Sequence, residues 1–152
     1  MTAKEFLNQI SQLEKEITRK KQRCQTLRDV AMNTSVNNSN DAVQCTKEKN
    51  PLEKILTKVI DLDREIEKDE MALVDLKAEI WEQLDKLTDE IQKRILWLRY
   101  VERKPWRHIA MKVNFTSRYV HKLHVKALDE LDEILKNKKR HYSSHKFTSV
   151  HS

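Results

Sequence analysis

The apolar residues in the first part of the chain follow a heptad pattern. From Phe6 to Ala31 they recur at alternating steps of four and three residues, interrupted by Lys20. A period of about 3.5 residues is typical of a helix that packs in a coiled coil. Polar residues then dominate residues 33–50, and this stretch predicts a polar loop.

A second heptad pattern follows this loop. Asn50 suits the N-cap of a helix and Pro51 its first turn. Apolar residues repeat with the same period from Leu52 to Ile80, and Asp69 is the charged residue on this seam. The pattern predicts a second long helix.

Folding the two helices back on each other brings their apolar positions together. In this antiparallel register Phe6 lies opposite Ile80. Lys20 and Asp69 lean toward each other, because helical side chains tilt toward their own N-terminus. We expect these charges to meet, although each can also reach solvent independently. The heptads can also pair between two chains, which would make a homodimer.

Residues 84–135 have the apolar spacing of a small helical domain. Thr88 and Asp89 are residue types favoured at a helix N-cap, and Pro105 marks the start of another helix. From Trp106 onward the chain matches the helix-turn-helix unit position by position. The positions expected to be buried are Ile109, Ala110, Val113, Phe115, Val120 and Leu123.

Three residues of this unit satisfy separate physical requirements. Ala110 is small where the two helices cross, and Asn114 tolerates the left-handed backbone of the turn. Thr116 can cap the second helix. Because these requirements are independent, their agreement strongly indicates a helix-turn-helix.

Charge is divided unequally along the chain. Residues 1–92 hold 15 Lys and Arg against 19 Asp and Glu, and residues 93–152 hold 15 against 5. The net charges of −4 and +10 favour a polyanionic partner for the second half, and we expect double-stranded DNA. The basic tail, residues 136–152, is predicted to be a disordered arm that adds sequence-independent affinity.

A set of residues between Leu84 and about Leu131 has a distinctive order and spacing: Leu87-Thr88-Asp89, the run from Ile95 to Tyr100, Trp106, Ile109-Ala110, Thr116, Val120, Lys126-Ala127-Leu128 and Leu131. Through these residues the segment resembles region 4 of sigma-70-type transcription factors. The resemblance implies a domain that places one helix in the major groove at promoter elements. The chain is also similar in organisation to small transcriptional regulators of phages and prophages of Gram-positive bacteria. Residues 1–80 do not resemble the promoter-opening part of a sigma factor, so we do not expect a sole sigma factor.

The recognition helix is expected at about residues 117–131, with its outward face toward DNA. Arg118 is the best candidate for a bidentate contact to guanine, and Ser117 and His121 can donate or accept hydrogen bonds. The basic residues around them are expected to bind phosphates, although such a face can also simply be solvated. The predicted DNA-binding residues are Arg107, Lys112, Thr116, Ser117, Arg118, His121, Lys122 and Lys126.

Several other functions are not expected. The chain has no glycine, which excludes glycine-rich phosphate loops and nucleophile elbows. No nucleophile and base are visible, so we expect no enzyme activity. Two histidine pairs have metal-ligand spacing but no third ligand beside them, so we expect no metal or cofactor. These pairs are His121 with His124 and His141 with His145.

The remaining residue types indicate a cytoplasmic protein with a helical core. No signal peptide or membrane segment is visible, so we expect a location in the bacterial host cell, at the nucleoid. Cys24 and Cys45 are then expected to be thiols. Trp81, Trp97 and Trp106 are expected to lie in the core.

Together these patterns predict an all-α protein in three parts. Residues 1–83 form a coiled-coil hairpin, residues 84–135 a helix-turn-helix domain and residues 136–152 a tail. The expected function is sequence-specific DNA binding in transcription regulation, with the coiled coil for dimerisation or partner binding. The alternatives are a sigma-like accessory that binds core RNA polymerase, and a recognition subunit for phage DNA packaging.

Overall fold

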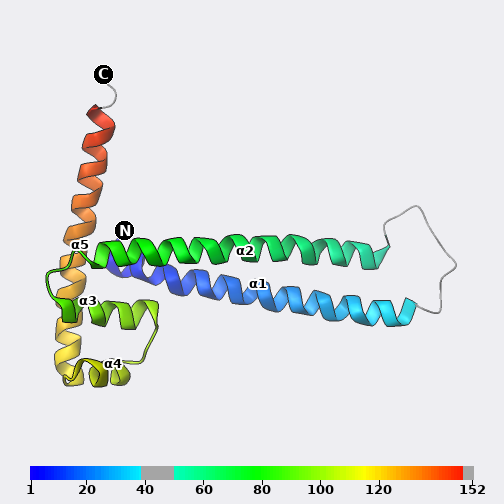
Figure 1. The fold of residues 1–152 in the computed structure, drawn as a ribbon, viewed down its shortest axis with the longest axis horizontal. Coiled ribbons are helices and arrows are strands. Elements are labelled where there is room, and N and C mark those ends of the chain that lie inside the picture. Colours follow the sequence, from blue (N-terminus) through cyan, green and yellow to red (C-terminus); the bar gives the residue numbers. More distant parts are fainter. Residues whose placement is uncertain (39–49, 149–152) are drawn as a thin grey trace. The chain divides into compact units, whose positions relative to one another are not determined.

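The regular structure of the protein is helical throughout its described part. The computed structural model describes residues 1–38 and 50–148. Figure 1 shows the elements, which are α1 (Ala3–Asn38), α2 (Pro51–Leu84), α3 (Glu90–Leu96), the π-helical turn η1 (Trp97–Val101), α4 (Trp106–Val113) and α5 (Ser117–Thr148). The predicted all-α class is confirmed. No described helix combines the length and the apolar character that a membrane span requires.

The chain forms two compact units. One consists of residues 12–74, and the other consists of residues 1–11 together with residues 75–152. The sequence pattern instead predicted boundaries after residues 83 and 135. The heptad pattern continues through both long helices without a break. It therefore did not indicate that the first turns of α1 and the last turns of α2 belong to the same unit as α3, α4 and α5.

Within residues 12–74, α1 and α2 run antiparallel along a seam of heptad residues (Figure 1). Asn50 caps the start of α2, because its Oδ1 accepts a hydrogen bond from the backbone N–H of Leu52 at 3.3 Å. The predicted capping role of Asn50 is confirmed. The side chains packed in the seam are Cys24, Leu27, Val59, Leu62 and Ile66.

The two seam charges meet as the register predicted. The Nζ of Lys20 lies 2.7 Å from Oδ2 of Asp69, and the two side chains are 24% and 23% exposed. The hydrogen bond that Lys20 donates to Asp69 raises the pKa of the Lys20 ammonium. One layer away, Cys24 is a buried free thiol that donates to Asp63 at 3.4 Å, and burial raises its pKa. Cys45 lies outside the described residues.

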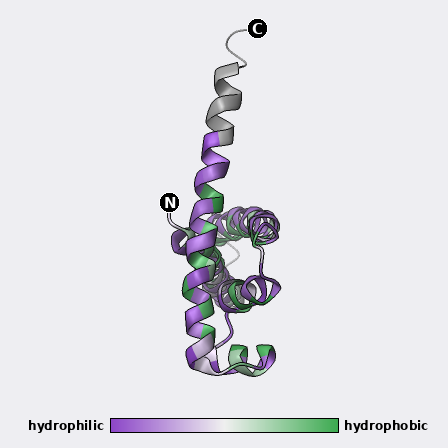
Figure 2. Cartoon of the chain, turned by 90° about the vertical axis from the view of Figure 1, so that its left-hand side faces the viewer, coloured by the Kyte–Doolittle hydropathy of each residue, from purple (hydrophilic) through white to green (hydrophobic). Residues whose placement is uncertain are grey.

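Two segments expected to be irregular are helical in part. α1 continues to Asn38, past the predicted start of the loop at residue 33, and residues 39–49 lie outside the described part. α5 continues to Thr148, whereas a disordered arm was expected from residue 136. Residues 136–140 are exposed, and Figure 2 shows the hydrophilic character of this part of α5. The chain has no glycine and no proline here to interrupt the helix.

The second unit has a core made by α3, η1, α4 and α5. The core residues are Ile95, Leu98, Ile109, Ala110, Val120 and Leu123, with Ile91, Trp106 and Val113 packed against them. The first turns of α1 are also buried, since Leu7 and Ile10 are completely inaccessible to solvent. The backbone N–H of Ala3 donates to Oδ1 of Asp132 on α5 at 2.6 Å. This unit therefore joins segments from both ends of the described chain.

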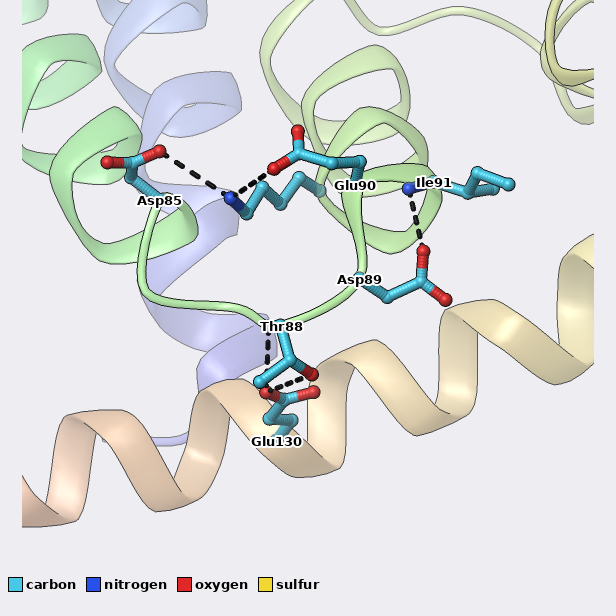
Figure 3. Close-up of polar contacts among 7 residues, drawn as sticks. Asp85, Thr88, Asp89, Glu90, Ile91 and Glu130 are labelled. Atoms are coloured by element: carbon cyan, nitrogen blue, oxygen red, sulfur yellow. Dashed lines mark hydrogen bonds and ion pairs between the residues drawn. The ribbon is translucent and has the colours of Figure 1, made fainter.

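A polar connection from α2 to α3 is bound to α5 (Figure 3). Thr88 donates its backbone N–H and its hydroxyl to Oε1 of Glu130, at 3.1 and 3.2 Å. Asp89 is the N-cap of α3, because its Oδ1 accepts from the backbone N–H of Ile91 at 2.8 Å. The N-cap was predicted for Thr88 with Asp89, and the structure assigns capping to Asp89 and bonding to α5 to Thr88.

Candidate nucleic-acid interface

The turn between α4 and α5 has the backbone geometry of a helix-turn-helix. α4 ends at Val113, and its C-cap residue Asn114 has φ 60° and ψ 40° in the left-handed region. The Oγ1 of Thr116 accepts a hydrogen bond from the backbone N–H of Tyr119 at 3.3 Å and so caps the start of α5. The predicted left-handed backbone of Asn114 and the predicted cap at Thr116 are confirmed. These local interactions determine how α5 leaves the turn.

The predicted buried face is largely correct. Ile109, Ala110, Val120 and Leu123 are all buried, and Val113 packs against them. The burial predicted for Phe115 is wrong, because this side chain is 38% exposed. Its ring packs edge-on against exposed Tyr119, with 5.0 Å between ring centroids. Phe115 lies in the turn between Asn114 and the cap, and its ring covers its neighbour on α5.

The tryptophans also differ from the expected core positions. Trp106 and Trp97 are partly buried. Trp81 is 57% exposed, and its ring lies edge-on against Trp97 with 5.1 Å between centroids. Both rings line a groove of about 690 Å³ whose wall includes Lys112. Trp81 therefore belongs to a surface of the protein, contrary to the prediction.

The outward face of α5 brings together most of the predicted DNA-binding residues. All of them are exposed; Arg118 and Lys122 lie on the side of α5 opposite buried Val120, and Ser117 and His121 lie between that side and the buried one. Thr116 stands at the cap, Lys126 lies one turn beyond Lys122, Arg107 is on the first turn of α4, and Lys112 is near the end of α4. Lys112 differs from the other predicted DNA-binding residues, because it lines the groove beside Trp81.

This surface has a positive charge that carboxylates do not offset. Residues 103–126 contain seven Lys and Arg and no Asp or Glu. Within the described part of the chain, Arg107, Arg118, Lys122 and Lys126 form no ion pair. A carboxylate that pairs with a surface cation weakens the positive potential around it. The four unpaired side chains therefore keep their positive potential for an anionic partner.

A cluster of rings and cations lies between α4, α5 and η1. The ring of Trp106 is 4.3 Å from that of His121 and 4.7 Å from that of His124, measured between centroids. The guanidinium carbon of Arg99 lies 4.5 Å from the centroid of Trp106. On the other side of His124, its Nε2 is hydrogen bonded to the hydroxyl of Tyr100 at 2.8 Å. These contacts fix the orientation of His124.

The surroundings of His124 keep its ring neutral at physiological pH. Burial, as the largest cause, together with the nearby groups His121, Lys4 and Arg99 lowers the pKa of His124 to about 4. Burial also raises the pKa of the Tyr100 hydroxyl, against a smaller opposite effect of Arg99. His124 is therefore a structural residue of this unit, whereas His121 is exposed on α5.

Sequence reasoning did not identify the cations on the other side of this cluster. A cleft of about 420 Å³ is lined by Lys4, Asn8, Ser11, Arg99, Tyr100, Arg103, Trp106 and His124. Arg103 has a left-handed backbone with φ 56°, which is unfavourable for a residue with a Cβ atom. Neither periodicity nor charge pointed to Lys4, because its place in the cleft depends on how α1 packs.

A metal site is a separate possibility for these polar residues. Among the residues that the structure describes, no group of three His, Cys, Asp or Glu side chains is arranged to hold a metal ion. The side chains of His141 and His145 lie outside the described set.

The comparison with protein families gives one match. Residues 32–132 match the model of a family described as "Protein of unknown function (DUF1492)". The match covers well over half of the 152 residues. The chain belongs to the DUF1492 family. In this DUF1492 protein the matched range includes α2, α3 and α4 and the predicted DNA-contact residues, and it leaves out Lys4. The comparisons with curated proteins and with solved structures found no match.

Proposed function

We propose that this protein binds double-stranded DNA through its helix-turn-helix and regulates transcription. The observation that carries the proposal is the exposed, carboxylate-free face of residues 103–126 on a helix-turn-helix with a left-handed turn and a capped second helix. A basic face on such a scaffold supplies the phosphate contacts on which DNA affinity depends. The resemblance to sigma region 4 adds the expectation that α5 enters the major groove.

The exposed residues of α5 have distinct proposed roles. Arg118 lies in the first turn, from which a recognition helix reaches base edges, and its guanidinium can bind guanine in a bidentate manner. Ser117 and His121 contribute hydrogen bonds that either donate or accept. Lys122 and Lys126, with Arg107 on α4, bind phosphates and hold the register of the protein on the duplex. Sequence preference therefore rests mainly on Arg118.

An Arg118→Ala variant tests this assignment. A preferred site is first selected from a random DNA library with the wild-type protein, and binding is then measured on that site and on random duplex. We expect a loss of about 1–3 kcal/mol on the selected site and little loss on random DNA. Arg64→Ala is the matched control, because Arg64 is exposed on α2 and forms no ion pair within the described residues. An equal loss of binding free energy on both DNAs would mean that Arg118 contacts a phosphate and does not read a base.

Mapping of bound DNA across the native genome tests the transcription role separately. Enrichment at promoters supports regulation. Enrichment at a packaging site would instead support the role of a recognition subunit in phage DNA packaging. Uniform binding would contradict both sequence-specific roles.

A second candidate function is that of an accessory that binds core RNA polymerase. The groove beside Trp81 favours it, because an exposed tryptophan at a partly apolar groove is a common anchor in protein interfaces. A pull-down of core RNA polymerase with and without DNA separates this candidate from the first. Retention that needs no DNA and is lost in Trp81→Ala would favour the accessory role.

A homodimer through the heptads has less support than these partners. Lys20, Cys24 and Asp69 already make their seam contacts within one chain. A dimer would therefore need a different surface or an exchange of helices between chains.

A further inference from the structure

The cleft beside Trp106 is unusual in its combination of charges. Three of the side chains that line it are cations, Lys4, Arg99 and Arg103, and none is a carboxylate. Asn8 and Ser11 of α1 add neutral hydrogen-bonding groups. Cations with neutral polar groups and no acidic residue are the typical ligands of a phosphate group.

The start of α1 is held in place by two sets of hydrogen bonds. Thr2 and Glu5 form a capping box, in which each backbone N–H donates to the side chain of the other residue, at 3.0 and 3.2 Å. The backbone N–H of Ala3 donates to Asp132 on α5 at 2.6 Å. Lys4 follows directly on this anchored turn. Its side chain is exposed and forms no ion pair within the described residues, so its ammonium can bind an anion.

Arg99 is also preorganised. Its guanidinium lies over the ring of Trp106, 4.5 Å from the centroid, and its Nη1 donates to the backbone carbonyl of Lys104 at 3.2 Å. An arginine has five N–H donors, so this one hydrogen bond leaves others for a ligand. The positive field here also acts on His124, whose pKa is lowered by burial and by Lys4 and Arg99 among its neighbours. The cations of the cleft are therefore close enough to act on one site.

We propose that this cleft binds a phosphate of the DNA backbone through Lys4 and Arg99, which makes the start of α1 part of the DNA-binding surface. The proposal rests on the DNA binding proposed above. Trp106 links the cleft to the recognition helix, because its ring contacts both Arg99 and His121. Small-molecule pockets are lined mainly by apolar side chains, whereas most of the residues lining this cleft are polar or charged. This lining favours a backbone phosphate over a free phosphorylated molecule.

The salt dependence of DNA binding tests the proposal in the full chain. Wild type, Lys4→Gln, Lys4→Arg and Lys15→Gln are titrated on a random-sequence duplex at several salt concentrations. Lys15 is the matched control, because it is an exposed lysine on α1 that does not line the cleft. Loss of one phosphate contact should lower the slope of log affinity against log salt by about 0.9, which weakens binding by about eightfold at about 0.1 M salt and by more at lower salt. Lys4→Arg and Lys15→Gln should keep the wild-type slope.

The other outcomes are distinguishable. An unchanged slope in Lys4→Gln, or an equal loss in Lys15→Gln, would overturn the cleft proposal while wild-type DNA binding stands. No binding of the duplex by the wild type at low salt would overturn the proposed function itself, and the cleft proposal with it. A calorimetric titration with AMP tests whether the cleft instead binds the phosphate of a free small molecule. Binding of AMP that Lys4→Gln abolishes, with DNA binding unchanged, would assign the cleft to a small ligand and overturn the backbone contact.

Discussion

His124 makes the stability of the helix-turn-helix unit depend on pH. Its ring is packed against Trp106, hydrogen bonded to Tyr100, and has its pKa lowered to about 4 by burial and by the cations around it. An unfolded histidine has a pKa of about 6.5. Between these two values the unfolded chain binds more protons than the folded protein. The free energy of unfolding therefore rises with pH in this window and falls as pH is lowered from about 6.5 to about 4.

The size of the effect follows from the same two values. The difference between 6.5 and about 4 corresponds to an upper limit of about 3.4 kcal/mol for the full window. The ring of His124 is only partly buried, and solvent screens its interactions with the exposed neighbours Lys4 and His121. We therefore expect His124 to account for about 1–2 kcal/mol of the stability lost on acidification.

Urea unfolding at neutral pH and at about pH 4.5 measures this contribution. His124→Gln keeps a hydrogen-bonding group for Tyr100 but does not titrate. The wild type should lose about 1–2 kcal/mol more than this variant, while carboxylates that titrate in both proteins cancel from the difference. His108→Gln is the control, because His108 is exposed on α4 and makes no hydrogen bond within the described residues. Parallel losses in wild type and His124→Gln would refute the reasoning.

Two further predictions concern the turn and the seam. Asn114→Ala should destabilise the protein by about 1–2 kcal/mol, because φ is 60° there, whereas Asn114→Gly should be close to neutral in denaturant unfolding. Equal effects of alanine and glycine would contradict the left-handed turn. Replacing either Lys20 or Asp69 with leucine should lower the Tm, because the partner is left partly buried without its counter-charge, and replacing both should recover stability. Additive Tm changes across the four proteins would show that these two charges are not coupled.

The features that could be predicted from the sequence are those that depend on local geometry. The pairing of Lys20 with Asp69 follows from the heptad period and the tilt of helical side chains. The left-handed backbone of Asn114 and the cap at Thr116 follow from what the backbone of a single turn requires. Phe115 was predicted to be buried by its position in the unit, but its ring remains partly exposed and packs edge-on against the exposed ring of Tyr119.

The cleft could not be predicted because it depends on contacts between distant segments. Lys4 lies on a heptad helix, and the pattern assigns that whole helix to the hairpin. Its place beside Arg99 results from the burial of Leu7 and Ile10 and from the bond between Ala3 and α5. Charge counts also missed Lys4, because it lies in the acidic half of the chain.

The bond between Ala3 and Asp132 also determines the order in which the protein can fold during synthesis. The two residues are 129 positions apart, so the ribosome makes the first turn of α1 long before its partner on α5 exists. The seam of α1 and α2 joins segments made earlier, and it can close while α5 is still being translated. Until then the apolar side chains of Leu7 and Ile10, which are buried in the folded protein, remain exposed to solvent. Because contacts between distant segments form slowly, the unit that contains α3, α4 and α5 should be the last part of the protein to become native, only after α5 has emerged from the ribosome.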